Sequence, residues 1–397
     1  MYDVHAWAPG RVNLIGEHTD HTDGLALPMA IQQGVGVEGT PADRIRLRST
    51  SQLGVVVDVA ADGSHVPADG WGRYVAAIAA ELGRLGRPPV GLDAEVTSTL
   101  QAGIGLSSSA ALEVSLAVAL LRAAVAVEGA RAPLDVRQLA LACRRAEHRA
   151  VGVPSGVLDQ AASLLGRAGA AVVLDCADLS WAAAPIPPAT TVVIIDSGVR
   201  RQLESSGYAQ RTEELGAALH VLGGRRPAEV DPAELDGLLA DLPAVPARRL
   251  RHVVTENARV RATVTAFASD DRDAIGRLFA ASHASLREDF EVTVPETDAL
   301  VELLVAEGAI GARMTGGGFG GAVIALAAVD GAQAVADRVV RRYRNHFPDR
   351  RPVTLVSAPA DGAAARAPDV VASADAPPTP RPDQTRQDDG TTPPCWR

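Results

Sequence analysis

The chain has 397 residues, with 38 basic against 48 acidic side chains and a formal net charge of −10, and every basic residue is an arginine. Without lysine, the chain has no Gly-Lys-Ser/Thr phosphate loop, no protein-kinase strand lysine and no Schiff-base amine. The acidic balance also argues against a nucleic-acid binder, which would carry a basic face. A phosphate site in this chain must therefore use arginine, backbone N–H groups, helix N-termini and metal.

The composition is that of a globular chain, with 47% hydrophobic and 22% charged residues. Its length predicts about two domains on the usual scale of about 150 residues each. The cysteines form no metal-binding spacing and predict reduced thiols: Cys143, Cys176 and Cys395.

The chain shows no targeting or membrane pattern. Residues 1–10 lack the basic and apolar regions of a signal peptide. The longest apolar stretch, 110–127, is interrupted by Glu113 and Arg122, and the prediction is that it does not span a membrane. We expect a cytoplasmic protein.

Strand and helix patterns are mixed along the chain, which predicts an α+β fold. Alternating or continuous apolar runs predict strands over 35–38, 45–47, 55–59, 92–98, 170–175, 191–196 and 323–327. Helical periodicity predicts helices over 71–85, 109–127, 136–150, 204–222, 250–266, 272–284, 295–308 and 333–347. A Pro-rich break at 185–188 predicts a domain boundary, and the change to Ala, Pro, Asp, Thr and Gln after residue 358 predicts a disordered tail over 359–397.

The run Gly103-Ile104-Gly105-Leu106-Ser107-Ser108-Ser109 lies between an expected strand and an expected helix. Glycines let the backbone approach an anion, and the first N–H groups and the dipole of the helix favour negative charge. This pattern fits a phosphate cradle that needs no lysine. A Gly/Ser turn in which a serine caps the helix is the alternative.

Two further segments are rich in glycine or in charge. Five of the six residues over 316–321 are glycine, which fits either a close backbone approach or a flexible hairpin turn. The segment 9–20 gathers Arg11, Glu17, His18 and Asp20 in an expected polar turn. Such a set of donors and acceptors suits a polyhydroxylated ligand, although a metal cluster and a solvated loop are alternatives.

Two acids lie on or near the helix expected over 136–150. Glu147 could hold Mg²⁺ together with a serine hydroxyl and phosphate oxygens, and Asp159 could orient or deprotonate an attacking hydroxyl. Isolated acids are also often plain surface charges.

In this order, the motifs resemble the GHMP small-molecule kinase superfamily and, within it, the galactokinase family. The segment 10–20, Gly-Arg-Val-Asn-Leu-Ile-Gly-Glu-His-Thr-Asp, resembles the galactokinase signature, and 105–110 and 315–321 resemble the ATP loop and third motif of the superfamily. The segments 156–160 and 285–296 resemble further galactokinase stretches. The likeness covers about residues 5–358.

The resemblance implies a fold, a reaction and a set of site residues. The fold would be a two-domain GHMP kinase, with a ribosomal S5 domain 2-like domain over 1–185, a ferredoxin-like α/β domain over 186–358 and the active site in the cleft between them. The reaction would be Mg²⁺-dependent transfer of the ATP γ-phosphoryl group to the anomeric hydroxyl of galactose, by a monomer that uses neither nucleic acid nor membrane. By matching position, the implied roles are Asp159 and Arg11 in catalysis; Glu17, His18, Asp20, Gly156 and Tyr208 at the sugar; Trp71 and Gly103, Ile104, Gly105, Leu106, Ser107, Ser108 and Ser109 at ATP; and Ser109 and Glu147 at Mg²⁺.

This chain departs from the family pattern at three places. His21-Thr22 stands where galactokinases usually have Tyr-Asn, Ser155 where they have cysteine, and Gln101 where they have proline. The first departure lies beside the sugar cluster and leaves the sugar preference open. A related sugar 1-kinase and a non-catalytic sugar and ATP sensor on the same fold are the alternatives, Trp71 could pack in a helix core, and Asp159 could be a base or an electrostatic positioner.

Overall fold

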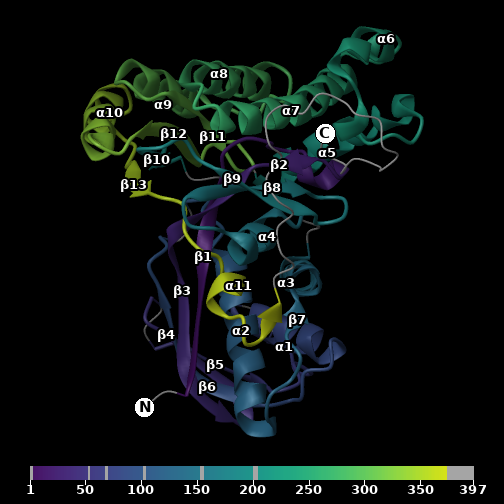
Figure 1. Ribbon diagram of the computed structural model, residues 1–397, viewed down its shortest axis with the longest axis vertical. Coiled ribbons are helices and arrows are strands. Elements are labelled where there is room, and N and C mark those ends of the chain that lie inside the picture. Colours follow the sequence, from purple (N-terminus) through teal and green to yellow (C-terminus); the bar gives the residue numbers. More distant parts are fainter. Residues whose placement is uncertain are drawn as a thin grey trace.

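The protein forms two lobes stacked along its long axis (Figure 1). The computed structural model describes residues 3–51, 54–67, 70–101, 104–152, 156–199 and 204–372, with the backbone alone at 204–206. Sheets and helices contribute to both lobes, which confirms the expected α+β class.

The N-terminal lobe is built on a five-stranded sheet of order β1-β3-β6-β4-β5. Neighbouring strands are antiparallel except β4 and β6, which are parallel. Helices cover one face of the sheet, and the buried Glu81 of α1 joins this helix to α3 through ion pairs with Arg145 and Arg149. The elements are β1 (Val4–Asn13), β3 (Pro28–Ala42), β4 (Arg44–Ser49), β5 (Val56–Ala60), β6 (Gly91–Ser98), α1 (Gly72–Arg84), α2 (Ser108–Glu128) and α3 (Val136–Val151).

Helix α2 is the core of this lobe. It is apolar on nearly all sides because it packs against β1, β3, α1, α3 and α4 (Leu158–Leu165) at once. By length and composition alone it could cross a membrane, but 67% of its most apolar window is buried inside the protein. Its hydrophobicity is therefore that of a core helix.

The C-terminal lobe is built on a four-stranded sheet of order β11-β12-β10-β13, in which the neighbouring strands are antiparallel. Long helices cover the sheet and face the top of the molecule (Figure 1). The elements are β10 (Thr190–Asp196), β11 (Gly311–Thr315), β12 (Ala322–Ala328), β13 (Val353–Ser357), α5 (Glu204–Gly216), α6 (Leu235–Leu239), α7 (Ala244–Ala268), α8 (Arg272–Glu288), α9 (Pro295–Ala306) and α10 (Ala332–His346).

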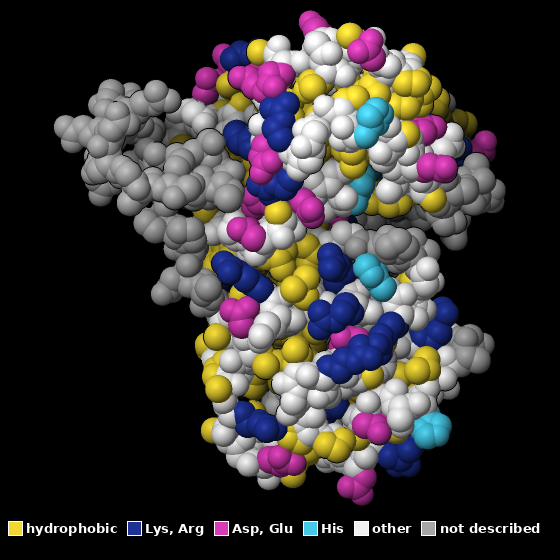
Figure 2. Space-filling view, turned by 90° about the vertical axis from the view of Figure 1, so that its right-hand side faces the viewer, with side chains coloured by type: hydrophobic (Ala, Val, Ile, Leu, Met, Phe, Trp, Pro, Cys, Tyr) yellow, Lys and Arg dark blue, Asp and Glu magenta, His cyan; other side chains and the backbone are white. Residues whose placement is uncertain are grey.

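A three-stranded sheet, β2-β8-β9, lies where the lobes meet. Its strands are β2 (Leu25–Ala26), β8 (Ala170–Asp175) and β9 (Trp181–Pro185). Strand β1 runs up to this junction, so the segment that follows it, from Leu14 to Asp20, meets helices of the C-terminal lobe. The space-filling view shows a waist between the lobes, with arginines gathered on the N-terminal lobe beneath it (Figure 2).

The disordered tail expected from residue 359 is wrong for residues 359–372. The chain returns to the N-terminal lobe, where Ala360 N donates to Ala30 O (3.0 Å) and Gly362 N to Gly166 O (2.9 Å). It then forms α11 (Ala363–Arg366) and β14 (Val371–Ala372), which pairs in parallel with β7 (Leu134–Asp135). Small residues pack here because they let backbones approach closely, a form of burial that a search for large apolar side chains misses. Residues 373–397 lie outside the described residues.

Most other expected elements are confirmed, with shifted ends. The helix expected over 204–222 is interrupted, since α5 ends at Gly216 and a 3-10 turn, Leu219–Leu222, follows. Residues 9–13, expected within a polar turn, belong to β1, and the turn begins only after Asn13. The pattern was missed because β1 is buried on both faces near its end and does not alternate there.

Candidate active site between the lobes

A cavity of about 190 Å³ opens between the two lobes. Elements of both lobes contribute to its walls, and charged or polar side chains dominate them. The lining residues are Arg11, Glu17, His18, Asp20, Glu147, Gly156, Leu158, Asp159, Tyr208, Gly316 and Gly317.

Arg11 and Asp159 form an ion pair inside this cavity. Arg11 lies near the end of β1, and its Nε and Nη2 lie 2.7 and 2.5 Å from Oδ1 of Asp159, in the first turn of α4. Its remaining nitrogen, Nη1, donates to Gly105 O at 2.9 Å. Ser107 Oγ donates a short hydrogen bond to Asp159 Oδ2. Both oxygens of Asp159 therefore already have donors.

The loop before α2 is tied to β1. Arg11 N donates to Leu106 O at 3.2 Å, and a Cβ at Gly10 would lie 2.6 Å from that same oxygen. Gly105 and Ser107 both have positive φ, 74° and 55°, which turns the chain sharply into the helix. The side chain of the N-cap residue Ser107 makes no capping hydrogen bond to α2, which leaves the first N–H groups of the helix available to an anion.

Behind the loop lies a chain of oxygen and amide groups. Ser109 Oγ donates to Glu147 Oε1 at 3.2 Å, and Gln160 Nε2 donates at 3.0 Å to both Glu147 Oε2 and Glu113 Oε2. Glu113 is fully buried on α2. Burial first, and then the charge of Glu147, raises its pKa to about 9, so it is protonated at neutral pH.

The Ser109 and Glu147 oxygens are of the kind that Mg²⁺ prefers. A magnesium ion is often held by one or two carboxylates together with substrate phosphates, and a serine hydroxyl beside one glutamate matches that donor set. Within the described residues there is no group of three or more His, Cys, Asp or Glu side chains that could hold a metal by itself. The residues fit a metal that arrives with a phosphate ligand.

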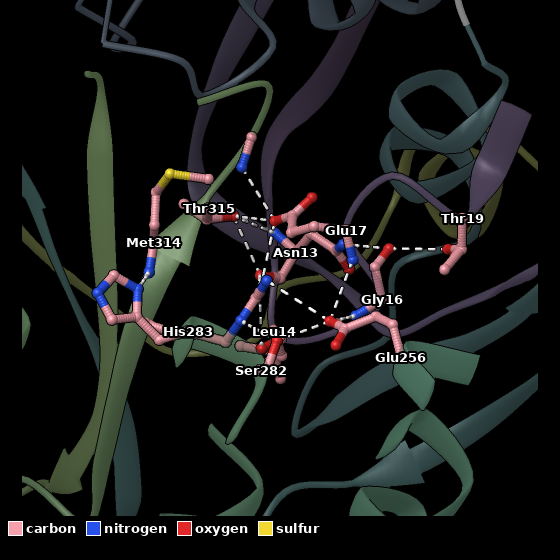
Figure 3. A network of polar contacts seen from close by, with 12 residues as sticks. Asn13, Leu14, Gly16, Glu17, Thr19, Glu256, Ser282, His283, Met314 and Thr315 are labelled. Carbon is pink, nitrogen blue, oxygen red and sulfur yellow. Dashed lines mark hydrogen bonds and ion pairs between the residues drawn. The ribbon is translucent and has the colours of Figure 1, made fainter. Parts of the chain in front are cut away.

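Glu17 is fixed by the C-terminal lobe (Figure 3). Its Oε1 accepts from Thr315 Oγ1 and Gly316 N, each at 2.9 Å, and from Arg313 Nη1 at 3.4 Å. Arg313 is fully buried and also donates to Asn13 O and Leu14 O. The carboxylate that faces the cavity is therefore held in one orientation by β11 and the glycine loop after it.

A second buried glutamate, Glu256 on α7, holds the turn that contains Glu17. Its Oε1 accepts from Gly16 N (3.0 Å) and Ser282 Oγ (2.7 Å), as Figure 3 shows, while Oε2 pairs with Arg259 at 2.6 Å. Burial raises the pKa of Glu256, but Arg259 and Arg313 outweigh it and hold the pKa well below its ordinary value. Glu256 is therefore an ionised anchor for the turn.

His18 lies in a left-handed conformation, with φ 61°, and packs among aromatic rings. Its ring stacks on Phe290 with centroids 4.5 Å apart, and Tyr208 and His252 lie within 5.8 and 6.4 Å. Burial, followed by the charges of His21 and His252, lowers its pKa well below the usual value. His18 is thus a neutral imidazole with one donor and one acceptor nitrogen.

Asp20, His21 and Tyr208 meet at the far wall of the cavity. His21 Nδ1 lies 3.5 Å from Asp20 Oδ1 and 3.4 Å from the Tyr208 hydroxyl. Burial raises the pKa of Asp20, but the hydrogen bond and charge of His21 lower it by more than that, so the pKa lies below its ordinary value. A Cβ at Gly156 would lie 1.7 Å from Asp20 Oδ2, so only glycine fits beside this carboxylate.

The glycine loop 316–321 closes the cavity from the C-terminal lobe. A Cβ at Gly318, whose φ is 89°, would lie 2.5 Å from Val292 Cβ, and Phe319 N donates to Val292 O at 2.6 Å. The segment is the turn of the β11–β12 hairpin, and its backbone also approaches Val292 closely, so both features expected of it are present.

The catalytic pair, the residues expected at the sugar and Glu147 line this cavity, whereas the residues expected at ATP do not. Ser107 and Ser109 contact the lining residues Asp159 and Glu147 from behind. Trp71 lies at the start of α1 and packs against the hydrophobic core, away from the cavity lining. Gly103 lies outside the described residues, and Ile104 and Leu106 are buried behind the loop.

Sequence reasoning missed the buried residues that support the site: Glu113, His252, Glu256, Phe290 and Arg313. Two of them left a signal: Glu113 is the acid that interrupts an apolar helix, and Phe290 lies in the family-like segment 285–296.

Comparison with known proteins agrees with this architecture. Residues 3–41 match the galactokinase galactose-binding signature, 73–167 the GHMP kinases N terminal domain and 263–349 the GHMP kinases C terminal domain. The structure of Lactococcus lactis galactokinase complexed with galactose is 30% identical and superposes with a TM-score of 0.82, covering 90% of this chain and 94% of that one.

More distant structures share the fold alone. Mevalonate kinase of L. major in complex with R-mevalonate has 18% identity and a TM-score of 0.61 over 90% of this chain and 97% of its own. Homoserine kinase from Cytophaga hutchinsonii has 20% identity and a TM-score of 0.56 over 91% and 97%. The two lobes with a glycine-rich loop and a helix N-terminus at their junction are thus the GHMP kinase fold, and within it the chain belongs to the galactokinase family.

Proposed function

We propose that the protein is a galactokinase, which transfers the γ-phosphoryl group of ATP to the anomeric hydroxyl of D-galactose and yields galactose 1-phosphate and ADP. The observation that carries the proposal is the place of the Arg11–Asp159 pair, which lies between a wall of polyol-type donors and acceptors and the N-terminus of α2. Phosphoryl transfer depends mainly on alignment of the two substrates and on charge stabilisation. The first wall would hold the sugar, and the N-terminus of α2 would hold the phosphates of ATP.

The sugar wall consists of Glu17, His18, Asp20 and Tyr208, with Gly156 beside them. Carboxylates accept hydrogen bonds, the tyrosine and the neutral histidine can also donate, and sugar hydroxyls need both. A ring that leaves one of these buried groups unpaired would bind poorly.

Asp159 and Arg11 act on the attacking hydroxyl. Three donor atoms from Arg11 and Ser107 converge on Asp159, which favours an orienting and electrostatic role over that of a free base. Arg11 adds a delocalised positive charge where the C1 oxygen would lie. The acceptor hydroxyl is then aligned without a strongly basic group.

The N-terminus of α2 and the hydroxyls of 107–109 receive the phosphates, with Ser109 and Glu147 as the residues that would hold Mg²⁺. A bound magnesium ion supplies charge neutralisation on the β- and γ-phosphate oxygens. In a chain without lysine, the ion and Arg11 provide the positive charge at this point. Trp71 stays proposed near the adenine, with its core packing as the competing explanation.

Two alternatives differ in testable ways. A related sugar 1-kinase is kept open by His21, since it contacts two residues of the sugar wall. A non-catalytic sensor is disfavoured because Ser107, Ser109 and Asp159 are all present and in contact with the groups a kinase needs.

We also propose a cytoplasmic monomer with a division into domains over 1–185 and 186–358, where residues 359–372 join the first domain. The end of β9 at Pro185 and the start of β10 at Thr190 support the boundary. The buried free thiols Cys143 and Cys176 support a reducing compartment.

The direct test is ADP release from Mg²⁺·ATP with a panel of hexoses, pentoses and uronic acids, checked by identification of the sugar phosphate. We expect turnover with galactose and a 1-phosphate product. Turnover only with another sugar would select the related kinase, and binding without turnover would select the sensor.

A further inference from the structure

His21 stands where the family motif usually has tyrosine, and its ring contacts residues that are expected to bind the sugar. It lies in the 3-10 turn Asp20–Thr22, outside the cavity lining, and contacts two residues that do line the cavity. A single atom, Nδ1, is 3.5 Å from Asp20 Oδ1 and 3.4 Å from Tyr208 Oη. Its ring is also edge-on to His18, with centroids 6.3 Å apart.

The protonation of that nitrogen follows from its neighbours. A bare Nδ1 would direct its lone pair at the carboxylate of Asp20, which is repulsive, whereas an Nδ1–H is attracted to it. The other nitrogen, Nε2, is buried and has no hydrogen-bond partner among the described residues. An unpaired acceptor is tolerated more readily than an unpaired N–H there, which again places the proton on Nδ1.

The proton on Nδ1 then determines what Tyr208 can do. With Nδ1–H beside it, the hydroxyl oxygen of Tyr208 can accept from His21 but cannot donate to it. The hydroxyl hydrogen is left for the cavity, which Tyr208 lines next to Asp20. The wall thus presents a donor and an acceptor side by side.

We infer that His21 is a positioning residue that sets the hydrogen-bond polarity of the Asp20–Tyr208 pair, so that one hydroxyl of the bound sugar donates to Asp20 while it accepts from Tyr208. This inference rests on the proposed function for the identity of the sugar. The inference adds a basis for sugar selectivity. When the donor and acceptor of the Asp20–Tyr208 pair are fixed and partly buried, a sugar that lacks the facing hydroxyl, or carries it in the other configuration, leaves both groups unpaired and binds poorly.

The kinetic test compares three variants in the full-length protein. His21→Leu removes both ring nitrogens, and we expect the KM for galactose to rise about 10-fold while kcat and the KM for ATP change less than about 2-fold, because the group acts on sugar binding alone. His21→Asn places an amide N–H near the position of Nδ1–H and should restore the KM to within about 3-fold of wild type. His65→Leu, an exposed histidine outside the site, is the control and should leave every constant unchanged.

Deoxygalactoses locate the hydroxyl. With the one monodeoxy sugar (of those lacking the hydroxyl at C2, C3, C4 or C6) that lacks the group facing the pair, the His21→Leu effect should fall below about 2-fold. An effect of equal size with every deoxy sugar would overturn the inference. So would equal impairment of the Leu and Asn variants, since that outcome indicates a merely structural role.

A measurement without sugar separates this inference from the proposed function. Two-bond ¹H–¹⁵N spectra of ¹⁵N-histidine-labelled protein at pH 8, with the His21 signals assigned by their loss in His21→Asn, report the tautomer. Protonated Nδ1 supports the inference, and an Nε2–H tautomer with bare Nδ1 contradicts it. If the wild-type protein turned over no sugar at all, the proposed function would fail while this spectrum still decided the role of His21.

Discussion

The sugar side and the phosphate side of the cavity each rest on a buried glutamate, but the two glutamates are in opposite charge states. Glu256 supports the sugar-side turn and is ionised, because Arg259 and Arg313 lower its pKa. Glu113 supports the phosphate side through Gln160 and is protonated, because it is buried beside the charge of Glu147 and, among the described residues, forms no ion pair. Both carboxyls are fully buried, so the difference in their charge comes from their neighbours.

The two sides also differ in how complete they are. The carboxylates of the sugar wall are already hydrogen-bonded by residues of both lobes. The phosphate side offers backbone N–H groups, serine hydroxyls and carboxylates, and in the proposed function a metal ion would balance its charge. Four substitutions test this contrast.

The largest effect is expected from Glu256→Gln. It removes one of the two carboxylates beside the buried Arg313 and the carboxylate that pairs with Arg259, and we expect the free energy of unfolding to fall by about 3–5 kcal/mol at pH 7 in urea titrations. Because the pKa of Glu256 is lower in the folded than in the unfolded protein, ionised Glu256 stabilises the fold at pH values above its unfolded pKa, and this stabilisation is lost as pH falls from there through the folded pKa. The difference in unfolding free energy between wild type and variant should therefore shrink in acid. The exposed Glu302→Gln is the control. A loss below about 1 kcal/mol would mean that Glu256 is not the ionised anchor.

Asp159→Asn tests the point at which the two sides meet. It keeps the shape but removes the charge that faces Arg11, and we expect kcat to fall about 100-fold or more while ATP binding is retained. Steady-state kinetics and an ATP binding titration measure the two effects separately, with the exposed Asp337→Asn as control. Wild-type kcat in the variant would remove Asp159 from the mechanism.

Glu113→Gln should increase stability, the opposite sign to Glu256→Gln. The pKa of Glu113 is raised to about 9 in the folded protein, above its unfolded value. Protonated Glu113 therefore contributes its full stabilisation of the fold at acid pH, and this stabilisation is lost as pH rises toward 9. We expect the advantage of the variant over wild type in unfolding free energy to be below about 1 kcal/mol at pH 5 and to grow by about 4 kcal/mol between pH 5 and pH 8. Glu128→Gln, at the exposed end of the same helix, should show neither change. A variant that is less stable than wild type at pH 8 would contradict a protonated Glu113.

The smallest effect is expected from Glu147→Gln, which tests whether Glu147 holds the metal on the phosphate side. Removal of one charged oxygen should raise the Mg²⁺ concentration for half-maximal rate about 10-fold, with the KM for galactose unchanged. The measurement is a Mg²⁺ titration at saturating ATP and sugar. An unchanged titration curve would assign the metal to other groups.

The sequence alone was sufficient for most regular elements and for the residues that line the cavity. The helices around Ala76, Leu116 and Ala336 have periodic or long apolar patterns that can be recognised without neighbours. Arg11, Glu17 and Asp159 lie in motifs whose order along the chain is typical of the family.

The supporting residues could not be predicted, because their roles depend on contacts between distant segments. Arg313 reaches Asn13 and Leu14 across about 300 positions of sequence, and nothing in its local strand pattern distinguishes it from an exposed charge. The alanines of 359–372 looked too small to form a core, yet α11 packs against α2, α4 and β1. Long-range complementarity of this kind is a property of the folded chain.

The return of the chain to the N-terminal lobe has a consequence for biosynthesis. Arg122 on α2 pairs with Asp369, and Arg366 lies over the ring of Trp7 on β1, 4.1 Å from its centroid. A ribosome delivers β1 and α2 first and these partners only after the entire C-terminal lobe has been made. The N-terminal lobe is therefore first to emerge from the ribosome but completes its contacts late. In a nascent chain, the surface of β1 and α2 that later contacts residues 366–369 stays uncovered while more than 200 further residues are synthesised.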